Sequence, residues 1–179
     1  MRKVLYIFSD LTDSDVEWLA SAGRRKVFTK DEVLIEEGRP LSDVFVLLTG
    51  ELSVVKRALP DSPVATLHEG EIVGELSFLD SRPPSATVVA NSNSVTLAIS
   101  RDELRVKLSS DPSFAAHFYR ALGVFLATRL RHTIESMGYA ESASRTEGEM
   151  SPDEIDPDLM DSMSLAARRF EVLVERFSS

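Results

Sequence analysis

Between residues 24 and 100, short apolar or β-branched segments alternate with polar turn segments. Strands of a few residues, bounded by glycine, proline and acidic residues, are typical of β barrels, rolls and sandwiches. The segments that we predict as strands are residues 27–28, 33–35, 44–48, 52–55, 64–67, 86–89 and 95–99. Turns are expected between them at residues 38–40, 49–51, 60–63 and 69–71.

Helical patterns flank the strand region on both sides. Residues 9–22 predict a short helix. The candidates for its N-cap are Asp10, Thr12 and Asp13. After the last strand, Ser100 is expected to cap a second helix, with Glu103 completing a capping box. A long helix is predicted from Pro112 to Met137, because proline suits the first turn of a helix.

The remainder of the chain changes in composition. Gly138 is a natural end for the long helix. Residues 139–157 are acidic and poor in apolar side chains, which predicts a flexible linker between a domain of residues 1–138 and a final segment of residues 158–179. That final segment predicts a helix with apolar residues at spacings of four and three: Leu159, Met163, Ala166, Phe170, Leu173 and Phe177. Such a row packs either on its own domain or on a partner, and the sequence leaves both interpretations open.

Charge and composition narrow the classes of function. The net charge is −9, from 29 acidic and 20 basic residues, and the chain has no cysteine. Disulfides and thiolate metal sites are therefore excluded, and His68, His117 and His132 have no carboxylate at ligand spacing, so no metal site is expected. The sequence contains no recognisable pairing of a nucleophile with a base, so we do not expect an enzyme.

The same charge balance bears on large partners and on location. Binding to DNA or to an anionic membrane needs a clustered basic face, and the sequence has none. No apolar run is long enough to cross a bilayer, and residues 1–8 are too short for a signal peptide. We therefore expect a cytoplasmic protein that binds neither DNA nor membrane.

Residues 70–87, GEIVGELSFLDSRPPSAT, carry the pattern with the most chemical content. Gly74 allows the backbone to approach a ligand closely. A helical turn that begins at Glu75 leaves free N–H groups, which can hold a phosphate. The carboxylate of Glu75 would repel that phosphate, so a better role for it is to accept a hydrogen bond from a sugar hydroxyl. The alternative is an ordinary hairpin connection, in which Glu75 only favours the helix N-terminus.

This stretch resembles the phosphate-binding cassette of cyclic-nucleotide-binding domains, in which Gly-Glu-Leu-Ala-Leu precedes a loop ending Pro-Arg-Ala-Ala-Thr. Residues 38–52 resemble the turn-strand-turn-strand core of that family, and residues 111–131 resemble its C-terminal helices. The resemblance covers residues 11–137 and includes the sensor half of catabolite-activator and Fnr-like regulators. It implies an α+β fold, an antiparallel β-roll flanked by N-terminal and C-terminal helices.

The resemblance also implies a ligand site for cyclic AMP or cyclic GMP, with no other cofactor. Gly74, Leu76 and Ser77 would offer backbone contacts, and Glu75 would bind the ribose 2′-hydroxyl. Ser85 and Ala86 would face the cyclic phosphate, and Thr133 would contact the purine. One position departs from the family, because Pro84 stands where the phosphate-binding arginine is expected. Arg82 could replace that arginine or remain an exposed loop charge.

Two functions follow from these expectations. The chain is either a stand-alone regulatory sensor of a cyclic nucleotide or related anion, or a degenerate domain that serves dimerisation and scaffolding. Too few residues follow the long helix for the winged helix-turn-helix of the related regulators. A homodimer is expected through the helix from Pro112 to Met137, along a row formed by Phe114, Phe118, Ala121, Phe125 and Thr128. A protein partner is a further expectation for the helix from Leu159 to Phe177.

Overall fold

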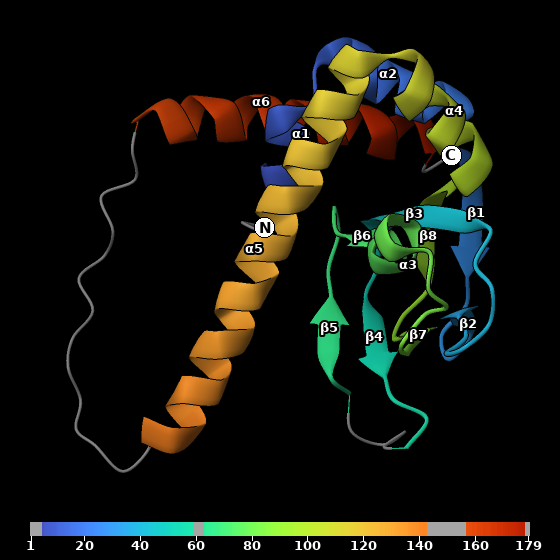
Figure 1. Cartoon of the computed structure of the whole chain (residues 1–179), viewed down its shortest axis with the longest axis vertical. Coiled ribbons are helices and arrows are strands. Elements are labelled where there is room, and N and C mark those ends of the chain that lie inside the picture. The colour runs from blue at the N-terminus through green and yellow to red at the C-terminus, as the bar shows by residue number, and fades with distance from the viewer. Residues whose placement is uncertain (1–4, 59–62, 143–156, 178–179) are drawn as a thin grey trace.

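The computed structural model describes residues 5–58, 63–142 and 157–177, and its helices and strands follow the predicted order (Figure 1). The helices are α1 (Leu5–Asp10), α2 (Asp13–Ala22), α3 (Glu75–Asp80), α4 (Arg101–Ser110), α5 (Pro112–Ser142) and α6 (Pro157–Phe177). The strands are β1 (Arg24–Phe28), β2 (Val33–Ile35), β3 (Asp43–Thr49), β4 (Leu52–Val55), β5 (Ala65–Leu67), β6 (Ile72–Val73), β7 (Thr87–Ala90) and β8 (Ser94–Ser100).

The strands form two antiparallel sheets that make a β-roll, as predicted. One sheet has the order β1-β8-β3-β6 and the other has the order β2-β7-β4-β5. Every predicted strand is present, although β1 begins earlier, at Arg24. The short strand β6 pairs with β3 and leads directly into α3.

Strand β3 explains how the molecule acquires two apolar cores. Side chains alternate across a strand, and both faces of β3 are buried. Val44, Val46 and Leu48 pack under the helices, in a cluster with α1, α2, α5 and α6. Phe45 and Leu47 instead face the interior of the roll. Because both faces of β3 are buried, its sequence is apolar from Val44 to Leu48 without alternation.

The N-terminal helical region differs from the prediction of one helix over residues 9–22. Two helices are present, α1 and α2, and Thr12 caps the second. The Thr12 hydroxyl accepts a hydrogen bond from the Asp15 backbone N–H at 3.2 Å, and the Asp15 carboxylate accepts the Thr12 N–H at 2.7 Å. This reciprocal pair starts a new helix and thereby separates α2 from α1.

Helices α4 and α5 begin at the predicted residues, but Glu103 does not complete the predicted capping box of α4, and the end of α5 is not as predicted. The Ser100 hydroxyl accepts the Glu103 N–H at 3.5 Å, and α5 begins at Pro112. Helix α5 passes through Gly138 and ends at Ser142, so the prediction that it stops at Met137 was wrong. A glycine inside a helix costs only about 1 kcal/mol, which does not end a long helix. Residues 143–156 of the predicted linker lie outside the described residues.

The row of apolar residues expected to form a dimer contact on α5 is instead buried within this chain. Phe114, Phe118, Ala121 and Phe125 are each less than 5% exposed and belong to the core under the helices. Among the α5 residues whose side chains the structure describes, the exposed large apolar ones are Tyr119, Leu130 and Ile134. The predicted surface therefore faces the chain's own core, and a different stripe of α5 is open.

Helix α6 packs on its own chain, against α1, α2 and β3 (Figure 1). Ala166 and Leu173 are fully buried, and the Phe170 ring lies 5.5 Å from that of Phe8. Arg169 pairs with Asp13 at 2.7 Å. The structure thus supports the first of the two interpretations of this helix, although the side chains of Leu159 and Met163 lie outside the described residues. Among the described residues, no helix is long and apolar enough to cross a membrane.

Candidate functional site

The candidate site begins where β6 passes into α3. Gly74 caps α3 with a φ of 89°, in the left-handed region that favours glycine. A Cβ at this position would lie 2.6 Å from the side chain of Leu41. The positive φ therefore favours glycine at this position, and an added Cβ would also require the Leu41 side chain to shift.

Two sets of hydrogen bonds fix the segment that follows Gly74. The guanidinium of Arg101 donates to the carbonyl oxygens of Leu41 and Ser77, both at 2.6 Å, and ties α3 to the connection between β2 and β3. The Gly38 N–H donates to the Pro84 carbonyl at 2.8 Å and holds the loop after α3. The cassette is thus anchored at its helix and at its loop.

A cavity of about 330 Å³ lies between this segment, the roll and α5. The structure brings to it seven of the residues predicted for the ligand site: Gly74, Glu75, Leu76, Ser77, Ser85, Ala86 and Thr133. Pro84 also lines the cavity, and the floor is apolar, with Val54, Leu67 and Val88 from the strands. Helix α5 closes one side with Leu126, Arg129 and Leu130.

Glu75 is the buried charge of this cavity. It is 4% exposed, and one oxygen of its carboxylate accepts a hydrogen bond from Arg129 Nη1 at 2.9 Å. The same guanidinium lies 3.9 Å from the carboxylate of Glu71, which is also buried, and 5.1 Å from the centre of the Phe125 ring. Burial raises the pKa of the Glu75 carboxyl above its ordinary value, while the charge of Arg129 opposes the rise.

Thr133 lies one helical turn beyond Arg129 on α5. Its hydroxyl donates to the Arg129 carbonyl at 2.9 Å, and the residue lines the cavity from an exposed position. The sequence analysis did not assign Arg129 to the ligand site. Its contact with Glu75 joins positions 54 residues apart, and no local pattern indicates such a contact.

Arg82 does not line the cavity. Its side chain is 84% exposed, and its Nε lies 3.8 Å from the carboxylate of Asp80. The Arg82 backbone N–H also donates to Asp80 at 3.0 Å, which fixes the residue on the outside of the loop. The two prolines that follow restrict the backbone further. Two roles were considered for Arg82, and in this structure it is an exposed loop charge.

Lys56 is a basic residue beside the cassette that the sequence analysis missed. It follows β4, and by alternation it shares a face with Leu52 and Val54, which point into the roll. The Lys56 amine donates a hydrogen bond to the carbonyl oxygen of Ser85. The alternation along residues 52–56 is the signal that could have identified it, because the next inward position after Val54 is Lys56.

Known protein domains are similar to the part of this chain that carries the cavity. Residues 25–111 match the family model described as "Cyclic nucleotide-binding domain". A solved cyclic nucleotide-binding domain from Methylobacillus flagellatus KT is 27% identical, with a TM-score of 0.66, and the alignment covers 84% of this chain and 86% of that one.

Two curated relatives are similar to part of this chain over a short segment of their own length. A cGMP-dependent protein kinase of Eimeria tenella is 30% identical over 63% of this chain, and a cAMP-dependent protein kinase regulatory subunit of Pyricularia oryzae is 30% identical over 53%. The matched segments span 11% and 24% of those two proteins. The likeness therefore concerns one domain of each relative.

Proposed function

Residues 25–111 belong to the cyclic nucleotide-binding domain family, and from this membership we propose that the chain is a regulatory domain that binds a cyclic nucleotide in the cavity beside α5. The observation that carries the proposal is the convergence of seven predicted ligand residues on one cavity with a buried carboxylate. The names of the two kinase relatives, one cAMP-dependent and one cGMP-dependent, support this class of ligand.

Lys56 is the cation that we assign to the cyclic phosphate. Pro84 removes the arginine expected at that position, and Arg82 points away from the cavity. The amine of Lys56 lies against Ser85, a residue of the cavity wall, and could turn from the carbonyl to a bound phosphate. An ammonium binds a phosphate as a point charge, without the paired hydrogen bonds of a guanidinium.

Glu75 provides the link between ligand and helix. Its proposed partner is a ribose hydroxyl, but in this structure Arg129 of α5 already donates to its carboxylate. A ligand hydroxyl would share or replace that hydrogen bond. Occupancy of the cavity would then change how α5 is held, and α5 also contacts α1 and α4. This is the step by which binding would become a signal.

The second candidate function is a scaffold that binds no cyclic nucleotide. Two observations favour it: Pro84 replaces the usual arginine, and the Glu75–Arg129 pair satisfies the buried carboxylate without any ligand. In that case the cavity would be a remnant, and α5 would be held permanently.

Homodimerisation through α5 is part of either proposal. Tyr119 is 49% exposed, Leu130 is 61% exposed and Ile134 is 59% exposed. The spacing of these residues places them along one side of the helix, together with the exposed Gly123. A second copy would bury this stripe, which soluble proteins tend not to leave open.

Thermal unfolding in the presence of cyclic mono- and dinucleotides tests the ligand proposal. A ligand that binds only the folded state raises the midpoint, by an amount that grows with concentration. We expect a rise with cyclic AMP or cyclic GMP and none with the linear 5′-monophosphates. The absence of any rise with the whole panel would favour the scaffold.

A further inference from the structure

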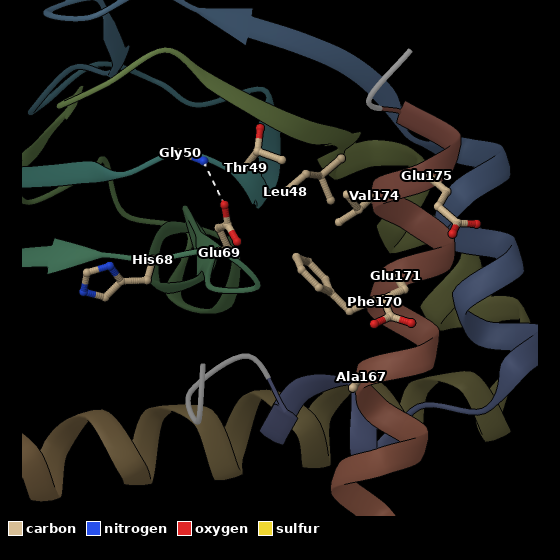
Figure 2. A pocket seen from close by; sticks show the side chains of 10 residues that line it. All are labelled: Leu48, Thr49, Gly50, His68, Glu69, Ala167, Phe170, Glu171, Val174 and Glu175. Carbon is tan, nitrogen blue, oxygen red and sulfur yellow. Dashed lines mark hydrogen bonds between the residues drawn. The ribbon is translucent and has the colours of Figure 1, made fainter.

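A second cavity, of about 490 Å³, lies on a different part of the molecule and shares no residue with the nucleotide cavity. Figure 2 shows it between α6 and two turns of the roll. Thr49 is the last residue of β3, Gly50 lies in the turn that follows it, and His68 and Glu69 follow β5. Ala167, Phe170, Glu171, Val174 and Glu175 line it from α6.

The floor of this cavity is apolar and aromatic. Leu48 is fully buried beneath it, and Phe170 and Val174 are partly buried against the same core. The Phe170 ring projects from α6 toward the roll (Figure 2). Its packing against Phe8, at 5.5 Å between ring centres and 52° between planes, holds it in this position. The open part of the ring therefore offers a fixed aromatic surface to a ligand.

The rim of the cavity is acidic. Glu69, Glu171 and Glu175 are exposed, and of the described residues that line the cavity none is lysine or arginine. Glu69 is held at the rim because its carboxylate accepts the Gly50 N–H at 3.2 Å (Figure 2). The remaining ionisable side chain of the lining is His68. It lies 3.7 Å from the carboxylate of Glu51, a residue that does not line the cavity.

We propose that this cleft between α6 and the roll binds a basic peptide segment of a protein partner. An arginine or lysine side chain over the Phe170 ring would gain a cation–π contact. Glu69 from the roll and Glu171 from α6 line the same cleft and would pair with the charge (Figure 2). An apolar neighbour in the peptide would cover Leu48 and Val174. Because the rim carries three glutamates and, among the described lining residues, no lysine or arginine, it attracts cations and repels phosphates and other anions, so the cleft is not a second nucleotide site.

The probe for this proposal is a short fluorescein-labelled peptide of alternating arginine and leucine, with an alternating glutamate and leucine peptide as its counterpart. Fluorescence anisotropy with the full chain should show saturable binding of the basic peptide alone, and binding should weaken with added salt. Failure of the basic peptide to saturate, or equal binding of the acidic peptide, would overturn the proposal.

Charge-neutral variants separate the cleft from the general attraction of a protein whose net charge is −9. The double variant Glu171→Gln with Glu175→Gln should weaken binding about three- to tenfold, as the loss of two rim ion pairs implies. Its matched control is Glu17→Gln with Glu103→Gln, two exposed glutamates on α2 and α4. Equal weakening by both pairs would mean that only net charge matters and would contradict the assignment.

The aromatic contact has its own variant. Phe170→Leu keeps an apolar side chain against Phe8 but removes the ring, and should weaken the basic peptide by roughly two- to fivefold. Its thermal midpoint should be compared with that of the double glutamine variant, so that loss of folding is not read as loss of binding. Unchanged affinity in a folded Phe170→Leu protein would remove the ring from the site.

Discussion

Glu75 and Arg129 form an ion pair, at 2.9 Å, in the proposed nucleotide cavity. Burying a carboxylate without a partner costs folding free energy. The partner of Glu75 is Arg129 on α5, 54 residues further along the sequence. Arg129 is only partly buried, so it can exchange this contact for water more easily than Glu75 can. The carboxylate is the fixed member of the pair, and the guanidinium is the member that can move.

The first prediction concerns that pair. Arg129→Met should lower the free energy of unfolding by about 1–3 kcal/mol near neutral pH, because Glu75 is left charged and buried. Without Arg129, the pKa of Glu75 rises further. A carboxyl with a raised folded-state pKa loses stability as pH rises through that pKa, so the deficit should be smaller near pH 4.5 than near pH 7.5.

Urea unfolding at the two pH values measures this difference. The control is Arg131→Met, which removes an exposed arginine two residues further along α5. If Arg129→Met lowered the free energy of unfolding equally at both pH values, the loss would not come from the charge of Glu75, and the prediction would be wrong.

The second prediction concerns the cation for the phosphate. Lys56→Met should weaken cyclic-nucleotide binding by roughly tenfold or more, since a hydrogen bond to a charged group is lost. Arg82→Met should change affinity by less than about twofold, because that side chain is exposed and directed at Asp80. Calorimetric titration of both variants gives the comparison. A larger loss in Arg82→Met would mean that the loop rearranges and Arg82 turns inward.

At the scale of elements, the sequence predicted the roll well because local patterns define it. Alternation and turn residues located the predicted strands, and the Gly-Glu step located α3. The single helix expected over residues 9–22 failed because the reciprocal Thr12–Asp15 bonds begin a helix of their own. The dimer row on α5 failed because periodicity shows that a face is apolar, but it does not show what covers that face.

The site was partly predictable for the same reason. The cassette residues are contiguous, and a motif can identify them. Arg129 and Lys56 were not identified, because each reaches the site from a distant element: Arg129 from α5, and Lys56 from the end of β4. Contacts of this kind depend on how the helix and the strands are placed, and that placement is a property of the whole fold.

The third prediction compares two glycines. Gly74→Ala should lower the free energy of unfolding by about 1–3 kcal/mol, because alanine must adopt a positive φ and its Cβ meets Leu41. Gly123→Ala should raise it by about 1 kcal/mol, because position 123 is helical and nothing lies within 4 Å of the added atom. Urea unfolding measures both. A stabilising Gly74→Ala would contradict the backbone conformation described for the cassette.

At the scale of the whole molecule, α5 connects the parts. It closes one side of the proposed nucleotide cavity through Arg129, it packs against α1 and α4, and it exposes an apolar stripe. Helix α6 packs on α1 and frames the acidic cleft. A change in how α5 is held can therefore reach both the proposed dimer surface and, through α1, the helix that bears the cleft.

The fourth prediction concerns assembly. The wild-type chain should be a dimer by light scattering at micromolar concentration, and Ile134→Arg should yield monomers, because it places a charge in the exposed stripe of α5. The matched control is Val106→Arg on α4, where the native side chain is 66% exposed and the same charge is added away from the stripe. A monomeric wild type, or a dimer that survives Ile134→Arg, would exclude this surface.

The central claim is that the cavity beside α5 binds a cyclic nucleotide through Glu75. Isothermal titration calorimetry of the wild-type chain and of Glu75→Gln, each with cyclic AMP and cyclic GMP, tests it most directly. The account predicts saturable binding of at least one of these nucleotides to the wild type, and an affinity lower by roughly tenfold or more in the variant, because the neutral amide oxygen of glutamine is a weaker acceptor than the charged carboxylate. Absence of heat with both nucleotides, or equal affinity in the two proteins, would contradict it.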